Sequence, residues 1–306
     1  MNFAYFGELA ALGTALCWTF GSQMFEAAGK RVGATVVNWW RLVLALIFFC
    51  IISMIVRGVP IPLDFPIHAW IWLGLSGFIG FAVGDLFLFQ AIVVIGPRLS
   101  MLIMTLAAPI SAILGMIFLD EKYSLLQGLG MVVTLLGVGW VILERSGRSA
   151  TGNRKVRVVT VSGVLFAFLG TVGQATGYIL SKYGMLIEGN FLEPFGATQI
   201  RIIAGIVGFI PFLFYRKIWS KVFAALGNRP AMGFMTAASF VGPFLGVSLS
   251  LLALHYITAG VASTITALVP IFLIPSVIFI SKEHVSVRAI IGAVVAVGGV
   301  ILLLVK

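Results

Sequence analysis

Hydrophobic residues gather into long runs along the chain, and short polar segments separate the runs. The runs cover residues 4–27, 35–56, 68–94, 99–118, 124–143, 158–181, 195–215, 231–254, 260–280 and 287–305. A helix needs about 20 apolar residues to cross a bilayer, and the runs meet this length. They are apolar on all sides rather than alternating, so they predict helices and not the strands of a barrel. The pattern therefore predicts an all-α membrane protein with ten transmembrane helices.

The runs divide into two sets that resemble each other. The longest polar stretch, residues 144–157, predicts a connecting loop between a first half, 1–143, and a second half, 158–306. Both halves hold five runs, and the stretch 80–121 returns in degenerate form at 242–283. Because five is odd, the second half starts on the opposite side of the membrane from the first. We therefore expect two inverted repeats of five helices, a construction common among secondary transporters.

Composition supports a membrane protein and excludes several other classes. Sixty per cent of the residues are hydrophobic and 10% are charged, whereas soluble domains carry about 25% charged residues. The net charge of +10 does not indicate nucleic-acid binding, because the cations are scattered between apolar runs. Cys17 and Cys50 lie inside apolar runs and are expected to be packed free thiols. The N-terminus lacks the basic region of a cleaved signal peptide, so we expect the first run to remain as a helix.

The basic residues predict an orientation in the cell membrane. The loops after the odd-numbered runs hold fourteen cations, and the other side of the membrane holds four. The fourteen are Lys30, Arg31, Arg98, Arg145, Arg148, Arg154, Lys155, Arg157, Arg216, Lys217, Lys221, Arg229, Lys282 and Arg288. Cytoplasmic loops carry the excess of Lys and Arg, so the charge count predicts that both termini face outward.

Three sequence features resemble a known family. They are Trp18 in ALCWTFGSQ, Arg41 in NWWRLVLAL, and the stretch LAAPISAILGMIFLDEKYSLLQGLGMVVTLLGVGWVIL. The last pattern, a proline, an apolar run, a glutamate and a glycine-rich run, occurs twice. Over nearly its whole length the chain resembles the EamA-type carriers of the drug/metabolite transporter superfamily. The resemblance implies transport of small metabolites such as amino acids, or drug export. It also implies cytoplasmic termini for many members, and here we follow the charge count instead.

Asp85 is the first candidate for a functional residue. It lies near the middle of the third run, where an ionised acid facing lipid would cost at least ~2.5–3.5 kcal/mol. It must therefore face the bundle interior, a partner or water. A buried carboxyl group tends to take up a proton, which suits proton coupling or cation binding. A structural ion pair, or a cap near Gly84, is the alternative. Its repeat equivalent is Val247, so repeat symmetry does not require an acid here.

Polar stripes in the first and sixth runs are further candidates for substrate binding. Trp18, Ser22 and Glu26 stand at i, i+4 and i+8 on one helix face, which can line a polar path. The alternatives are packing for Trp18 and a surface ion pair with Lys30 for Glu26. Gln174 and Tyr178 stand at i and i+4 in the sixth run. Neutral hydrogen-bonding groups fit a small polar substrate and fit contacts between helices equally well.

Other candidates recur in both halves or lie in the eighth and later runs. Ser248 adds a polar group to the eighth run. Arg41 and Arg201 occupy equivalent positions, and they either bind helix carbonyls and headgroups or bind a carboxylate or phosphate of the substrate. Pro109 and Pro270 are the predicted gating bends. The glycines of the fifth and tenth runs predict close helix packing, either within the chain or across a homodimer.

No motif indicates an enzyme. The sequence has no His, Cys, Asp and Glu cluster at metal-ligand spacing, no G-x-S-x-G or H-E-x-x-H, and no phosphate loop ending in lysine. We therefore expect no cofactor and no metal, and a small molecule and membrane lipid as partners. We expect a secondary carrier that works by alternating access and is coupled to protons. A flippase of lipid-linked substrates and a non-transporting scaffold or accessory subunit are the alternatives.

Overall fold

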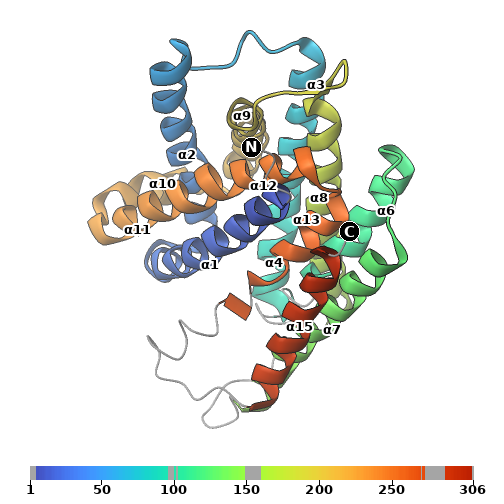
Figure 1. Cartoon of the computed structure of the whole chain (residues 1–306). Coiled ribbons are helices and arrows are strands. Elements are labelled where there is room, and N and C mark those ends of the chain that lie inside the picture. The colour runs from blue at the N-terminus through green and yellow to red at the C-terminus, as the bar shows by residue number, and fades with distance from the viewer. Residues whose placement is uncertain are drawn as a thin grey trace.

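A computed structural model describes residues 5–95, 100, 103–148, 160–269, 271–272 and 287–304. In these residues the chain is almost entirely helical (Figure 1). The α-helices are α1 (Phe6–Val32), α2 (Ala34–Arg57), α3 (Ile67–Gly77), α4 (Asp85–Ile95), α6 (Ala107–Phe118), α7 (Leu125–Arg148), α8 (Val161–Met185), α9 (Pro194–Tyr215), α10 (Trp219–Ala224), α11 (Arg229–Ser239), α12 (Val247–Tyr256), α13 (Ala259–Thr266) and α15 (Val287–Leu304). A two-stranded antiparallel hairpin, β1 (Leu186–Ile187) and β2 (Asn190–Phe191), joins α8 to α9.

The helices follow the predicted apolar runs. Five helical stretches of the described chain are long and apolar enough to cross a membrane, namely 34–57, 67–91, 161–185, 194–215 and 229–256. Shorter apolar helices cover 107–118, 125–140 and 290–303. Helix α7 continues through 144–148, which the sequence assigned to the connecting loop. The polar segments supply caps at several helix starts: the Glu193 carboxylate accepts from the backbone N–H groups of Phe195 and Gly196, and Pro194 opens α9.

Two π-helices interrupt the third and eighth runs at equivalent places. Helix η1 (Phe78–Gly84) lies between α3 and α4, and helix η3 (Phe240–Gly246) lies between α11 and α12, 162 residues later. Each is rich in glycine, which lets another helix approach. A Cβ on Gly173 of α8 would lie only 2.9 Å from the Cα of Gly84 in η1. Asp85 and Val247 are the residues that directly follow the two π-helices. Because π-helices are often found at functional sites, this level of the bundle is the place to look for one.

The helices of the two halves are interleaved. Helix α1 of the first half packs against α11, η3 and α12 of the second, and α8 of the second half packs against α3, η1 and α4 of the first. Helices α7 and α15 lie side by side (Figure 1). The glycines predicted to allow close packing lie between these two helices, since a Cβ on Gly137 would be 2.7 Å from the Gly292 carbonyl oxygen. The contact is within one chain, and a homodimer stays a prediction.

The molecule has two ends that differ in charge. The hairpin end is defined by the β1–β2 hairpin, the segments 58–66 and 119–124, the start of α1 and the end of α12. Contacts place these segments together: Phe191 stacks on His255 at 4.6 Å, and Phe6 meets Tyr256 at 5.1 Å. The basic end is defined by the α1–α2 junction, α10 and the start of α11, where Trp40 donates to the Val222 carbonyl. Described acids at the hairpin end are Glu8, Asp64, Asp120, Glu121, Glu188 and Glu193, whereas cations predominate at the basic end.

Candidate functional site

A buried ion pair lies at the level of the π-helices. The guanidinium of Arg41, on α2, binds the carboxylate of Asp85, the first residue of α4. Arg41 is 7% exposed and Asp85 is 3% exposed, so the pair is shielded from solvent. This is the ion pair that the sequence left open as the alternative to a free functional acid. It joins two candidates that the sequence treated separately, because the pattern of runs gives depth in the membrane but not which helices face each other.

Asn38 lies three residues before Arg41 on the same helix and is fully buried. Neither its amide nitrogen nor its amide oxygen has a hydrogen-bond partner in the described part of the chain, and the same holds for Nε of Arg41. Buried polar groups are normally hydrogen-bonded, so each exception calls for an explanation. Three buried polar atoms on α2, two on Asn38 and one on Arg41, thus lack a hydrogen-bond partner among the described residues.

Arg201, the repeat equivalent of Arg41, has no carboxylate partner in the described residues. It is 2% exposed, and its Nε and Nη1 atoms have no hydrogen-bond partner there. Its guanidinium lies over the ring of Phe81, with the central carbon 4.7 Å from the ring centroid. Helix α9 packs closely against α3 here because residue 77 is a glycine. A Cβ at this position would overlap the Arg201 backbone. The cation is thus held against an aromatic face and not against an acid.

Hydroxyl groups from three helices meet at Tyr178, which lies near Arg201. Tyr178 of α8 lies close to the hydroxyls of Ser250 on α12 and Thr266 on α13. Ser250 and Thr266 donate to the carbonyls of Val247 and Ala262, at 2.7 and 2.9 Å, which leaves their oxygens free to accept from a neighbour. The predicted residue Tyr178 therefore belongs to the same region as Arg201.

The remaining predicted residues lie in different surroundings. Glu26 pairs with Lys30 at 2.7 Å on a largely exposed surface at the basic end, as the alternative interpretation had it. Ser22 donates to the Thr19 carbonyl at 3.0 Å, and Ser248 donates to the Phe244 carbonyl at 2.7 Å. Trp18 packs against a buried apolar cluster that includes Phe81, Phe244 and Val247. Gln174, one turn before Tyr178 on α8, is half-buried. The structure thus pairs Arg41 with Asp85, places Tyr178 near Arg201, and places Glu26 at the basic end.

The bend near Pro109 lies slightly earlier than the proline itself. Pro109 falls in the first turn of α6, and the helix is interrupted at residues 105–106 just before it. Proline has no N–H to donate to the Thr105 carbonyl, which accepts from Ala108 at 3.3 Å instead. Pro270, the second predicted bend, lies outside the described residues. A turn at 267–268 precedes it, as the turn at 105–106 precedes Pro109.

At the hairpin end, Glu121 connects the two halves. Its carboxylate binds Lys182 of α8 at 2.7 Å, accepts from the Tyr123 hydroxyl at 2.6 Å, and accepts from the Ala259 N–H that begins α13. Burial raises the pKa of the Tyr123 phenol, and the adjacent Glu121 carboxylate raises it further. Tyr123 therefore keeps its proton and remains a donor. The sequence marked Glu121 as part of the repeat, but it gave no indication of Lys182 as its partner.

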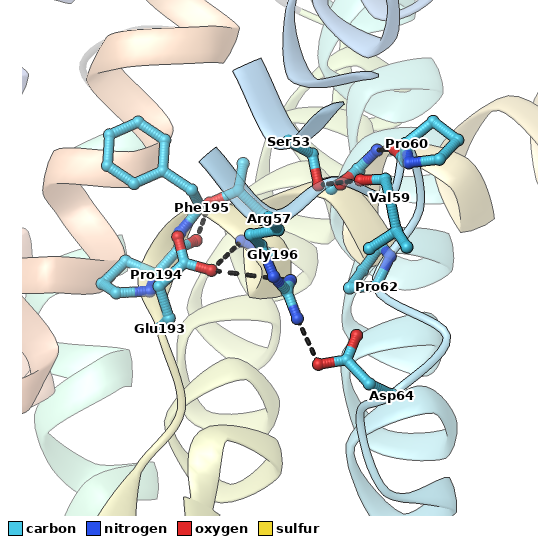
Figure 2. Close-up of polar contacts among 12 residues, drawn as sticks. Ser53, Arg57, Val59, Pro60, Pro62, Asp64, Glu193, Pro194, Phe195 and Gly196 are labelled. Atoms are coloured by element: carbon cyan, nitrogen blue, oxygen red, sulfur yellow. Dashed lines mark hydrogen bonds and ion pairs between the residues drawn. The ribbon is translucent and has the colours of Figure 1, made fainter. Parts of the chain in front are cut away.

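A second ionic network lies at the same end of the molecule. Figure 2 shows the Arg57 guanidinium, at the end of α2, between the carboxylates of Asp64 and Glu193. Glu193 also caps α9, through the N–H groups of Phe195 and Gly196 at 2.9 and 3.0 Å. Nearby, Gln199 donates to the Pro60 carbonyl at 2.6 Å. The loop after α2 is thereby tied to the start of α9, so this network also joins the two halves.

Comparisons with known proteins agree with this architecture. The model of the EamA-like transporter family matches residues 5–143 and again residues 161–305. A protein of Archaeoglobus fulgidus named "Uncharacterized transporter" is 28% identical over 153 residues, which are 49% of this chain and 55% of that protein. The chain thus spans about half the length of this curated relative. A crystal structure of a protein with no more specific name matches 97% of this chain and 96% of its own, with a TM-score of 0.69 and 14% identity. At that identity the likeness shows the fold alone.

Proposed function

The chain belongs to the EamA-like transporter family, and we propose that it is a secondary carrier that moves a small polar metabolite across the membrane by alternating access. The observation that carries the proposal is the buried set of Arg41, Asp85 and Arg201 at the level of the two π-helices. Ionisable residues inside membrane helices are costly, and they are found at substrate and ion pathways. The two halves would form inverted five-helix repeats, with the substrate between them near the midplane.

The interleaved packing supports a movement of one helix group against another. In this proposal the third and eighth runs, which contain η1 and η3, rock against α1 and α8. The breaks at 105–106 and 267–268 absorb the bending of the fourth and ninth runs. The Glu121–Lys182 and Arg57–Glu193 contacts join the halves at the hairpin end, so opening toward that side requires them to separate. They act as a closure at one end of the pathway.

Asp85 is the residue through which we propose proton coupling. A proton on its carboxylate would weaken the pair with Arg41 and so change the energy of the two states differently. The test is uptake into proteoliposomes across a pH series for wild type and Asp85→Asn. We expect the variant to lose the pH dependence of uptake. Asp120→Asn is the control, since Asp120 is exposed and its positive φ of 50° suits Asn. A wild-type pH profile for Asp85→Asn would refute the coupling role.

Cysteine labelling distinguishes a carrier from a membrane scaffold. Cys17 and Cys50 are first replaced by Ala, and single cysteines are then placed at positions 22, 85, 174 and 178. A carrier has a water-filled pathway in at least one state, so we expect a membrane-impermeant thiol reagent to label some of these sites and substrate to change the labelling. Four unreactive positions in a folded protein would favour the scaffold.

A further inference from the structure

The charges buried at the level of the π-helices do not balance. In the described residues the buried charged side chains are Glu8, Arg41, Asp85 and Arg201. Glu8 lies in the first turn of α1, at the hairpin end, and forms no ion pair with Arg201 in the described chain. Arg41 and Asp85 neutralise each other. Among the described side chains, the positive charge on Arg201 is left without a negative partner.

The repeat explains why this arginine is unpaired. Arg41 and Arg201 occupy equivalent positions in the two halves, but the acid that follows η1 is Asp85, and Val247 follows η3. In the described residues the second half therefore keeps the cation, and the position equivalent to Asp85 supplies no counter-ion. Asp85 is engaged with Arg41 on the same run that carries Phe81, four residues earlier, under the Arg201 guanidinium. A missing negative charge at Arg201 is thus a property of the sequence as well as of the packing.

The groups around Arg201 match those that recognise an oxyanion. Nε and Nη1 are unpaired donors, and a guanidinium presents its donors in a planar fork that fits a carboxylate or phosphate. The Tyr178 hydroxyl can donate to the same oxyanion, whereas Ser250 and Thr266, which donate to backbone carbonyls, can only accept from an N–H or O–H group elsewhere on the molecule. A Cβ on Gly80 or Gly177 would lie 3.7 or 3.6 Å from Nη2, so the backbones of η1 and α8 both pass close to the guanidinium.

We propose that Arg201 binds the carboxylate or phosphate group of the transported molecule, so that the substrate class is a small soluble organic anion. This inference rests on the proposed carrier function. Phe81 holds the guanidinium in place while the site is empty, and the anion supplies the missing negative charge when it binds. Because the donors come from α9 and the hydroxyls from α8, α12 and α13, the bound anion would link helices that move relative to one another.

The test measures binding to the full-length protein in detergent, which does not depend on transport. Thermal-shift and calorimetric titrations use succinate, glutamate and glycerol phosphate as probes. Succinamide, glutamine and glycerol are the uncharged counterparts, and sodium chloride is added to equal ionic strength. We expect the anions, and not their uncharged counterparts or chloride, to stabilise the wild type. Equal stabilisation by the uncharged counterparts or by chloride, or stabilisation by none of the probes, would overturn the proposal.

Variants at Arg201 assign the effect to this side chain. Arg201→Gln should weaken anion binding at least about tenfold, since a hydrogen bond to a charged group is lost. Arg201→Lys keeps the positive charge but loses the planar fork of donors, so its affinity for the anions should lie between those of wild type and Arg201→Gln. The matched control is Arg216→Gln, which removes an exposed charge at the end of the same helix and should bind like wild type. Unchanged affinity in Arg201→Gln refutes the site. If Arg201→Gln does not fold, Arg201→Lys is used instead, and wild-type affinity of that variant for every anion would refute the site.

Two further measurements separate the related possibilities. Phosphatidylglycerol added to neutral detergent micelles tests a lipid headgroup as the anion, and competition by this lipid equal to that of glycerol phosphate would overturn the assignment to a soluble molecule. Uptake into proteoliposomes tests the carrier itself. Anion binding without uptake of any probe would leave the site intact and refute the carrier, whereas uptake that Arg201→Gln leaves unchanged would refute the site and leave the carrier.

Discussion

Two equivalent arginines have different environments because of a single residue, the acid at position 85. Arg41 has a buried carboxylate partner and Arg201 has an aromatic ring. Removing one member of a buried ion pair costs about 3–5 kcal/mol, since the other charge is left unpaired, whereas removing both costs much less. The buried residues of this bundle should therefore respond to substitution as a coupled set and not one at a time.

We predict that Asp85→Asn lowers the free energy of unfolding by about 3–5 kcal/mol, because it leaves Arg41 buried without a counter-ion. The double variant Arg41→Gln/Asp85→Asn should recover most of this loss. Denaturant titration in detergent micelles, followed by tryptophan fluorescence, measures the free energy of unfolding of wild type, both single variants and the double variant. A double variant whose loss equals the sum of the two single losses would show that the pair is not coupled in this way.

At this scale the sequence predicted which residues are buried and polar, but not their partners. Asp85, Arg41 and Arg201 stand out because a charge inside an apolar run is costly wherever it points. Their partners depend on how the helices rotate and pack, which the apolar runs do not encode. Lys182 and Glu121 lie 61 residues apart and meet only because α6 and α8 end beside the start of α13. No local pattern predicts that meeting.

The helices themselves were predicted well because they depend on local composition. The predicted runs and the described helices agree within a few residues at most boundaries, as at 35–56 for α2 and 195–215 for α9. The two π-helices were not predicted, although Gly80 and Gly84, repeated as Gly242 and Gly246, mark their positions. Local propensity gives little guidance there, since the wider helical turn is stabilised by close contacts with α8 and α1.

The contact between α7 and α15 gives a sharp test at the level of helices. A Cβ on Gly299 would lie 2.8 Å from the Gly130 carbonyl oxygen, whereas a Cβ on the adjacent Gly298 meets nothing within 4 Å. We predict that Gly299→Ala lowers the free energy of unfolding by about 1–3 kcal/mol, since the helices must separate. Gly298→Ala should be neutral or stabilising by up to about 1 kcal/mol, because alanine favours the helix. Thermal unfolding compares the midpoints of the two variants directly. Equal midpoints would contradict the close contact between α7 and α15 at Gly299.

On the scale of the whole molecule, the two halves are joined at the hairpin end by partly buried ionic contacts. Glu121 holds Lys182, Tyr123 and the start of α13 together. We predict that Glu121→Gln costs about 1–3 kcal/mol, because it keeps the size of the side chain and leaves Lys182 without its counter-ion. The neighbouring Asp120→Asn, on an exposed side chain, should stay within about 0.5 kcal/mol of wild type. Thermal unfolding measures both, and a wild-type midpoint for Glu121→Gln would show that Glu121 does not hold this junction together.

The distribution of charge over the whole molecule predicts how it sits in the membrane. The sequence predicts fourteen cations on one side of the membrane, including those of the α1–α2 junction, α10 and the start of α11, and four on the other side, so the basic end should face the cytoplasm. Helix α1 begins at the hairpin end, and α15 runs antiparallel to α7 and ends beside the start of α7, near that same end. Both termini should then lie outside. We predict that alkaline phosphatase fused to either terminus is active and that a green fluorescent protein fusion is dark. Opposite results at the two termini would contradict an even number of spans, whereas a fluorescent fusion at both would keep the ten helices and reverse the orientation.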